Sequence, residues 1–500
     1  MTFASPSLAS FLKKRTAWIC TFIALFTAIV PFARSFFKME AHYNEGWNVY
    51  NTGIVAHHGL LYPTAVGWTT NNYPMLSFYV LAQLHRLTHD YLFTARILSL
   101  LSLIACSILV AAIVHSLGAA HRSSALAGLF CFALFCAAAQ VYVGADDPQM
   151  FAQVFFLLGL LVYVRGRGSL WNIAAAALLF VIAGFIKHNP VDFPLAVLAE
   201  LLLLSIPRAL WFALCGLALA AAAFALNVHY GGPFFLAQLL TPRTYLPGHL
   251  LEQCINVFGP LIFPYCVAAY TAFTVRRDTQ RRIALILFIT TIVVGVYFSG
   301  GRGVSINAFF SSMLAMSILV GLFFDKVFLA QQPPTTSRFA TYAPISLFLW
   351  LVIPMLLSGN WNPIRTIRDD ATAQRHFAQD VAFLRTHPGP ALCESMLECY
   401  FAGKPYLYDP FNATRLIHFH QLDANVLIDQ IRQHRFSAIQ TDDPLPNEDH
   451  YDSERWDPSV RAAIEANYIP APAQPVGPTH TNQDIGDVGV VFYIPKPASN

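Results

Sequence analysis

The chain has 500 residues, of which 56% are hydrophobic and 12% are charged, and its mean hydropathy is +0.49. Soluble domains carry about 25% charged residues, so a water-soluble fold could not cover this much apolar surface. The net charge of +3 is too small to indicate a nucleic-acid-binding protein. The apolar content excludes intrinsic disorder, and nine cysteines spread over so long a chain exclude a small disulfide scaffold. Composition therefore predicts a multi-pass membrane protein.

Apolar stretches long enough to cross a bilayer recur before residue 360. A hydrocarbon core of about 30 Å needs roughly 20 apolar residues per helix. The pattern predicts an all-α membrane domain with about eleven transmembrane helices. They are expected at residues 17–36, 93–115, 123–142, 148–165, 170–187, 190–206, 209–229, 255–274, 282–299, 304–324 and 341–358.

The basic residues of the short loops predict the orientation, because Lys and Arg gather on the cytoplasmic side. With eleven spans, one side carries Arg15, Arg122, Arg165, Arg167, Arg208, Arg276, Arg277, Arg281, Arg282 and Lys326. The opposite loops contain fewer basic residues, among them Arg86, Lys187, Arg243 and Arg302. We therefore expect a protein of the inner (plasma) membrane with a cytoplasmic N terminus. The C-terminal part is then outside, in the periplasm or its equivalent.

Two outer loops, residues 37–92 and 230–254, are long and rich in aromatic residues. Their short amphipathic stretches are typical of helices that lie in the membrane interface. We expect such interfacial helices in both loops.

The last part of the chain has the composition of a soluble domain. Of the 28 acidic residues, ten precede residue 360 and the other eighteen follow it. We therefore divide the chain into a membrane domain, residues 1–360, and an outer domain, residues 361–500. Alternating helices and apolar strands predict a small α/β unit. The first helix is expected at 371–386, and strands at 390–394, 405–409, 436–441 and the final VGVVFYI.

Cys393 and Cys399 lie close together in this outer domain. They form a disulfide if the compartment is oxidising, or they remain a free pair.

Carboxylates at the edge of a membrane domain are costly, so each one requires an explanation. Five of the ten before residue 360 gather on the outer side, at Glu40 and Glu45, at Asp146 and Asp147, and at Asp192. Two carboxylates from different loops could act as a general base and its orienting partner, or hold a divalent cation such as Mg²⁺ or Mn²⁺. The structural alternatives are a helix-end charge in water for Glu40 and a helix N-cap for the Asp-Asp-Pro sequence.

Basic residues on the outer side are candidate anion ligands. Lys187, followed by His188, lies at an outer helix end, where Lys is uncommon. Its ammonium could bind a phosphate, or the side chain could simply extend to the interface. Arg243 and Arg302 are similar candidates, and glycines beside Arg302 expose backbone N–H groups at the start of a span.

Several motifs follow one another in a definite order. The first outer loop reads MEAHYNEGWNVYNTGIVAHHGLLYP and then NNYPMLSFYVLAQL, and it is followed by Ala95-Arg96 at the start of the second span. GADDPQMFAQVFFLLGLLVY, GFIKHNPVDFP, GGRGVSINAFFSSMLAM and KPYLYDPFNATRL come later. This order resembles that of the polytopic C-type glycosyltransferases that use polyprenyl-phosphate sugars, a group that includes protein O-mannosyltransferases and aminoarabinose transferases. The usual Asp-Glu of that family stands here as Met39-Glu40, and its Tyr-Pro-Pro as Tyr73-Pro74-Met75.

The resemblance implies transfer of a sugar from a lipid phosphate to an acceptor hydroxyl with inversion. An acidic residue deprotonates or orients the hydroxyl, and positive groups stabilise the leaving phosphate. It implies Glu40 as the base, supported by Asp146 or Asp147, and Lys187, Arg243 and Arg302 as donor-phosphate ligands. Tyr43, Trp47, Tyr73 and His188 are the expected substrate-binding residues. The expected partners are a lipid-linked sugar donor, membrane lipids, and a glycan, lipid or protein acceptor.

Two other functions fit parts of the pattern. A transporter or flippase for a lipid-linked glycan also needs interfacial helices and a few membrane acids, but it should carry ionisable residues near mid-span. Here the spans are nearly free of charge and the acids lie on one side, which favours an enzyme. A structural subunit with a partner-binding outer domain would not explain the outer acids.

Overall fold

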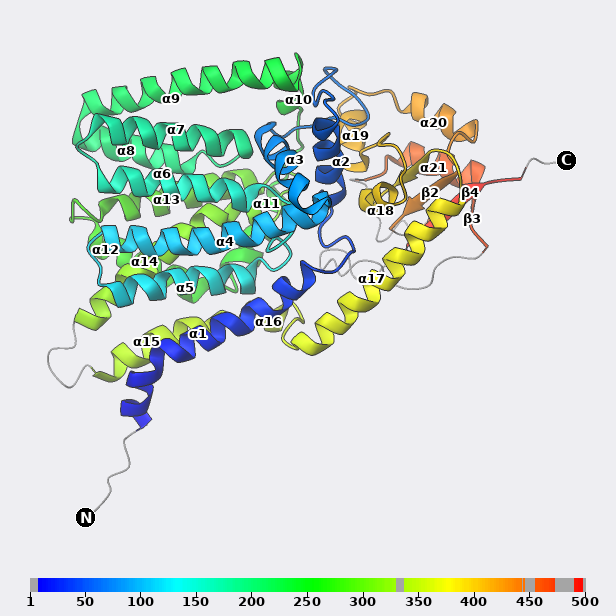
Figure 1. The fold of residues 1–500 in the computed structure, drawn as a ribbon. Helices are drawn as coiled ribbons and strands as arrows, with labels where there is room; N and C mark the ends of the chain where they lie inside the picture. Colours follow the sequence, from blue (N-terminus) through cyan, green and yellow to red (C-terminus); the bar gives the residue numbers. More distant parts are fainter. Residues whose placement is uncertain (1–7, 330–336, 443, 446–454, 473–489, 498–500) are drawn as a thin grey trace.

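The computed structural model describes residues 8–329, 337–442, 444–445, 455–472 and 490–497. Figure 1 shows a bundle of long helices and, at one end of it, a smaller domain that contains the strands. The first described helix begins at the far end of the bundle, and the last described strand lies in the smaller domain.

The bundle is built from helices that match the apolar stretches of the sequence. They are α1 (Leu8–Arg34), α4 (Tyr91–Ser116), α5 (His121–Ala138), α6 (Gln149–Arg165), α7 (Leu170–Ile186), α8 (Asp192–Leu204), α9 (Ile206–Leu226), α12 (Ile262–Val275), α13 (Arg282–Ser299), α14 (Phe310–Leu329), α15 (Ser337–Trp350) and α16 (Val352–Leu357). Within the described ranges, six helical segments are long and apolar enough to cross a membrane, or seven if one bent pair is a single span. The chain is thus a multi-pass membrane protein, and the eleven expected crossings are not confirmed.

The bent pair corrects one expected span. Residues 255–274 do not form a single helix, because α11 (Pro247–Phe258) and α12 meet at 85°. Gly259-Pro260 falls at the break, and proline cannot donate the backbone hydrogen bond that a continuous helix needs. α11 therefore belongs to the second outer loop rather than to the bundle.

Burial distinguishes the centre of the bundle from its edge. In the span that contains α14, 78% of the apolar window is buried, whereas in the span that contains α9 only 11% is. A helix that is apolar all round is buried or faces lipid. α14 therefore forms the core, and α9 presents its apolar side chains to the surroundings, as lipid-facing helices do.

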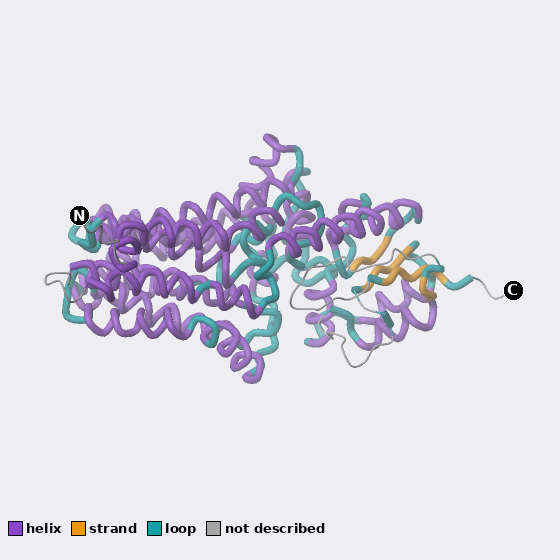
Figure 2. Tube along the Cα trace, turned by 90° about the horizontal axis from the view of Figure 1, so that it is seen from below, coloured by secondary structure: helices purple, strands orange, loops and turns teal. Residues whose placement is uncertain are grey.

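The outer loops fold into short helices between the bundle and the smaller domain. These are α2 (Asn44–Ala56), α3 (Leu76–Thr88), α10 (Phe235–Leu239) and α11, with the π-helical turn η1 (Asn227–Gly231) and the 3₁₀ turn η2 (Ile306–Phe309) nearby. Figure 2 shows that irregular loops also gather in this zone.

The smaller domain begins with α17 (Pro363–Thr386), which runs away from the bundle (Figure 1). Its sheet contains β1 (Ala391–Cys393), β2 (Ala438–Thr441), β3 (Tyr468–Pro470) and β4 (Val491–Pro495) in the order β1-β2-β4-β3. β1 and β2 are parallel, pairing Leu392 with Ile439, and the other two pairs are antiparallel. The remaining helices are α18 (Met396–Phe401), α19 (Pro410–His418), α20 (Ala424–Arg432) and α21 (Pro458–Asn467).

The strand expected at 405–409 is wrong. This segment is an irregular loop, in which Tyr408 stacks on Trp456 with ring centroids 5.1 Å apart. The Asp409 side chain accepts a hydrogen bond from the Asn412 backbone and caps α19. A helix therefore begins directly after Asp409. β3 was not predicted from the sequence.

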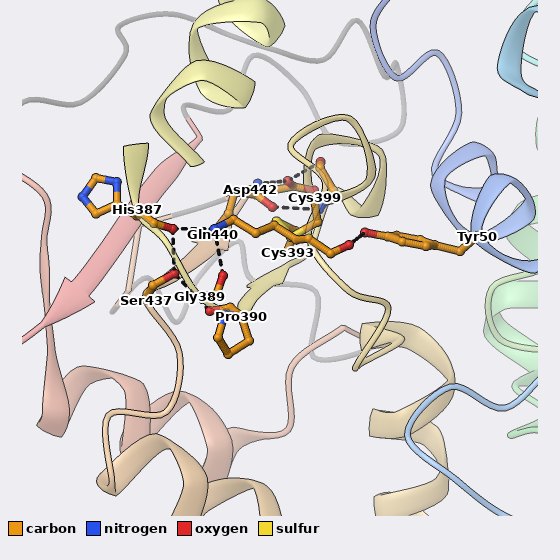
Figure 3. Close-up of a disulfide and its surroundings, with 11 residues drawn as sticks. Tyr50, His387, Gly389, Pro390, Cys393, Cys399, Ser437, Gln440 and Asp442 are labelled. Carbon is orange, nitrogen blue, oxygen red and sulfur yellow. Dashed lines mark hydrogen bonds between the residues drawn. A yellow bond between two sulfur atoms is a disulfide. The ribbon is translucent and has the colours of Figure 1, made fainter. Parts of the chain in front are cut away.

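Cys393 and Cys399 form a disulfide, with Cα atoms 5.9 Å apart (Figure 3). Near it, the Tyr50 hydroxyl of α2 donates to the Lys404 carbonyl at 2.9 Å. A Cβ added to Gly46 of α2 would collide with the backbone of Met396 and Leu397 in α18, so glycine permits this close approach. α2 therefore ties the smaller domain to the bundle.

Candidate active site

A cavity of about 1080 Å³ lies where the outer loops meet the smaller domain. Membrane-side residues line most of it, and Asp409, Phe411, Asn412, Arg415 and Arg455 line it from the smaller domain. Six residues that the sequence predicted as site residues line it, namely Tyr43, Trp47, Tyr73, Lys187, His188 and Arg243. Glu40, Asp146, Asp147 and Arg302 do not.

Lys187 is the buried cation of the membrane side. It follows α7 directly, its side chain is 1% exposed, and its Nζ lies 3.5 Å from Asp147 Oδ2. The same ammonium lies 3.5 Å from the centre of the Tyr73 ring, and Trp47 packs edge-on against that ring. Nζ makes no hydrogen bond with the described residues. Its charge is therefore held by an ion pair and an aromatic face, with its donors available to a ligand.

Asp147 stands directly behind the cavity wall. Its Oδ2 accepts a hydrogen bond from Asn44 at 3.0 Å, and its Oδ1 accepts one from the Gln149 backbone at 2.7 Å. The second contact is the helix-start role that the Asp-Asp-Pro sequence predicted. Asn44 and Lys187 both line the cavity, so Asp147 positions two lining side chains as well as starting α6.

Asp146 and Glu45 belong to a buried cluster around Arg96. Arg96 of α4 donates to Glu45, with its nearest N–O distance at 2.6 Å, and to the carbonyls of Phe37 and Met39. Glu45 also accepts from the backbone N–H of Asp146 at 3.1 Å. Burial opposes the charge of Glu45, but Arg96 holds the pKa of this carboxyl below its usual value. One ion pair therefore fixes the first outer loop to α4 and to the start of α6.

We expect Arg96→Met to destabilise the protein by about 3–5 kcal/mol, because Glu45 would become an unpaired buried charge. Thermal unfolding in detergent measures the loss, and Arg86→Met, on the exposed side of α3, is the matched control. An Arg96→Met variant that unfolds with the wild type would show that the pair does not hold the loop.

Glu40 lies away from the cavity lining. It is 4% exposed, and neither carboxyl oxygen has a hydrogen-bond partner among the described residues. Burial, followed by the charges of Asp442 and Glu45, raises the pKa of Glu40 well above its usual value. Its role as the base stays a prediction, but it faces the smaller domain and favours the protonated form, which cannot accept a proton.

In the smaller domain, one arginine pairs with two acidic side chains. Arg455 pairs with Asp442 at 2.8 Å and with Glu394 at 3.6 Å, and its guanidinium lies 4.2 Å from the centre of the Tyr43 ring. The Tyr43 hydroxyl accepts a hydrogen bond from the Phe411 backbone at 3.2 Å. Tyr43, at the cavity wall, thus contacts the smaller domain through both its ring and its hydroxyl.

The loops that carry Arg243 and Arg302 are joined to one another. The Arg302 backbone N–H donates to the Thr244 carbonyl, and the Leu246 N–H donates to the Gly300 carbonyl. Gly301 and Gly303 line the cavity on either side of Arg302, so the glycine-rich turn reaches the wall even though the Arg302 side chain does not. The donor-phosphate role of Arg302 stays a prediction.

His188 lies beside these cations. Burial, and then the charges of Lys187 and Arg243, lower the pKa of His188 to about 3. The ring is therefore neutral at ordinary pH, and it can donate or accept one hydrogen bond without adding charge.

Sequence reasoning missed the residues that the smaller domain supplies. Arg415 and Arg455 line the cavity from more than 200 residues beyond Lys187, and only the KPYLYDPFNATRL motif, which contains Arg415, gave a signal. Asp192 was grouped with the outer acids but given no role. It starts α8, lines the cavity, and accepts a hydrogen bond from the Phe193 backbone.

No protein-family model matches the chain, and no curated protein matches its sequence. Solved structures do match. ArnT from Cupriavidus metallidurans, in a crystal structure bound to undecaprenyl phosphate, gives a TM-score of 0.58 over 95% of this chain and 98% of that chain, at 14% identity. The Archaeoglobus fulgidus oligosaccharyltransferase, tethered to an acceptor peptide with the NVT sequon, gives 0.56 over 93% of this chain and 74% of that chain, at 11% identity. The chain has the C-type glycosyltransferase fold.

This fold confirms the resemblance on which the sequence analysis relied. The match with ArnT covers nearly the whole length of both chains, so it includes the smaller domain as well as the bundle. The C-type glycosyltransferase fold therefore accounts for the outer helices and the C-terminal domain together.

Proposed function

We propose that the protein is an integral-membrane glycosyltransferase. It moves a sugar from a polyprenyl-phosphate donor to the hydroxyl of an extracytoplasmic glycan, lipid or protein, with inversion at the anomeric carbon. The observation that carries this proposal is the cavity, in which the buried cation Lys187 lies with Arg243 beside aromatic side chains. Phosphate binds such cations, and sugars pack on aromatic faces. The ArnT crystal structure with undecaprenyl phosphate supports a lipid-phosphate donor.

The proposed donor site uses Lys187 and Arg243 for the phosphate, with His188 and the glycine-rich turn at Arg302 beside them. Departure of the lipid phosphate develops negative charge, which fixed cations stabilise more strongly in a site with little water. Tyr43, Trp47 and Tyr73 form the aromatic wall for the sugar.

For the base, we prefer Asp147 to Glu40. Neither side chain lines the cavity, but Asp147 Oδ2 lies 3.5 Å from Nζ of the lining residue Lys187, whereas Glu40 favours the protonated form, which cannot take a proton. Asp147 also holds Asn44, which can orient an acceptor hydroxyl. Asp146, whose pKa is raised by burial and by Glu45 and Asp147, is assigned a supporting structural role.

We further propose eleven crossings, with residues 361–500 outside the cytoplasm. The shorter apolar helices Gln149–Arg165 and Leu170–Ile186 run beside the longer ones in Figure 1 and would supply part of the difference. A disulfide at Cys393–Cys399 fits an oxidising compartment.

A fusion of alkaline phosphatase to the C terminus should therefore be active, and a reporter that works only in the cytoplasm should be silent at the same place. Fusion after Lys326, in the last turn of α14 at the end proposed to be cytoplasmic, is the matched control and should give the reverse result. An active cytoplasmic reporter at the C terminus would invert the topology and place the cavity on the wrong side for the proposed acceptor.

Transfer and transport differ in their products. In vesicles that contain the purified protein, a labelled polyprenyl-phosphate sugar and an acceptor extract, a transferase releases free polyprenyl phosphate, detected by mass spectrometry. A flippase moves the intact donor between leaflets. Intact donor that only changes leaflet would replace the proposal with transport, and parallel reactions with Mg²⁺, Mn²⁺ or EDTA test the need for a divalent cation.

A further inference from the structure

Arg415 enters the cavity from the smaller domain. It lies on α19, is 8% exposed and lines the cavity wall. One terminal nitrogen donates to Thr241 Oγ1 at 2.8 Å, but its buried Nε has no hydrogen-bond partner among the described residues. A buried donor of a charged group without a partner is costly, and a bound anion is one way of satisfying it.

A second arginine lies close by. Arg243 lines the same cavity, and burial, followed by the charge of Arg243, lowers the pKa of Arg415 to about 10. Asp409 offsets part of this positive charge. Both arginines line one cavity and Arg415 is buried, so an anion bound in the cavity would offset their like charges.

The neighbouring segment exposes apolar side chains. Thr241, which Arg415 contacts, lies two residues after the end of α10, and this part of the chain carries exposed apolar side chains at Leu236, Leu240, Leu246 and Leu251. Exposed apolar residues next to a cationic site are typical of a membrane surface. The anion is therefore expected on a lipid rather than free in water.

We propose that Arg415, supplied by the C-terminal domain, completes with Arg243 the site for the phosphate of a polyprenyl lipid. This inference rests on the proposed function and assigns the domain a direct part in donor binding. α19 is held against the first outer loop, because the Asp409 N–H donates to the Trp68 carbonyl at 2.8 Å and the Phe411 N–H to the Tyr43 hydroxyl. Binding of the phosphate and packing of the smaller domain against the first outer loop then stabilise each other.

The test uses the full-length protein in nanodiscs and undecaprenyl phosphate as the probe. Arg415→Gln should weaken binding about tenfold, Arg415→Lys should recover part of the loss, and Arg432→Gln should bind as the wild type does. Arg432 is the matched control, because it lies in the same domain with its side chain 62% exposed and pairs with Asp429. Thermal unfolding of each variant separates lost binding from lost folding.

Equal affinity of wild type and a folded Arg415→Gln would overturn the inference. Competition by millimolar inorganic phosphate as strong as that by the lipid would also overturn it, because the site would then take a soluble anion. A different result would contradict the proposed function alone. In that case the wild type binds undecaprenyl phosphate and Arg415→Gln weakens the binding, yet the wild type releases no polyprenyl phosphate from any sugar donor. In transfer assays, Arg415→Gln should raise the KM for donor more than it lowers kcat.

Discussion

Lys187→Met should weaken use of the polyprenyl-phosphate sugar by about tenfold or more. A charge-assisted contact to phosphate is lost, and tenfold corresponds to about 1.4 kcal/mol. Arg243→Met should behave similarly, because Arg243 also lines the cavity, whereas Arg302→Met should have a smaller effect because its side chain does not. The dependence of transfer rate on donor concentration measures all three.

Two controls make this result interpretable. Lys187→Met leaves Asp147 without its cation, so thermal unfolding of this variant separates lost folding from lost phosphate binding. Arg86→Met removes an exposed outer charge from α3 and should keep normal donor dependence. Unchanged donor dependence in the Lys187, Arg243 and Arg302 variants would leave these residues as interface anchors.

Asp147→Asn should lower turnover by about 10²–10⁴, the range that general-base assistance supplies. The exchange keeps the size of the side chain and its contact with the Gln149 backbone, but it removes basicity and the ion pair with Lys187. Glu40→Gln should retain most turnover, because a neutral glutamine replaces a carboxyl that burial already favours in its neutral form. Single-turnover transfer measures the chemical step separately from donor binding.

The reverse outcome would restore the assignment implied by the family resemblance. If Glu40→Gln abolishes transfer with folding and donor binding intact, while Asp147→Asn keeps wild-type turnover, Glu40 is the base and Asp147 only starts α6. Glu45→Gln does not serve as a mild control, because Glu45 holds Arg96 and its loss should reduce stability.

The membrane part could be predicted because lipid imposes a simple rule on sequence. Long apolar stretches become helices, and helices are found at each expected span, with the break at Gly259-Pro260 as the main departure. Gly259-Pro260 marks that break in the sequence, but the hydropathy of residues 255–274 does not show it. The strand expected at 405–409 does not form, because the helix cap at Asp409 and the stacking of Tyr408 on Trp456 decide the local structure.

The site was predictable only where its residues come from ordered motifs. Lys187, Trp47 and Tyr73 were found because each belongs to an outer-side motif of the resemblance, and Arg243 because it is a basic residue of an outer loop. Glu40 satisfied the same pattern, yet burial and then the charge of Asp442 raise its pKa, and Asp442 lies about 400 residues away in sequence. The position of Arg415 in the cavity wall likewise depends on contacts between distant segments, which spacing along the chain cannot show.

The measurement that tests the central claim most directly is a structure of the full-length protein in nanodiscs with undecaprenyl phosphate. The account predicts density for the phosphate in the cavity, within hydrogen-bond distance of Lys187 or Arg243, with the polyprenyl chain leaving past α10 and α11 toward lipid. A phosphate bound elsewhere, for example on the outer face of α9, with the cavity empty at saturating lipid, would contradict it.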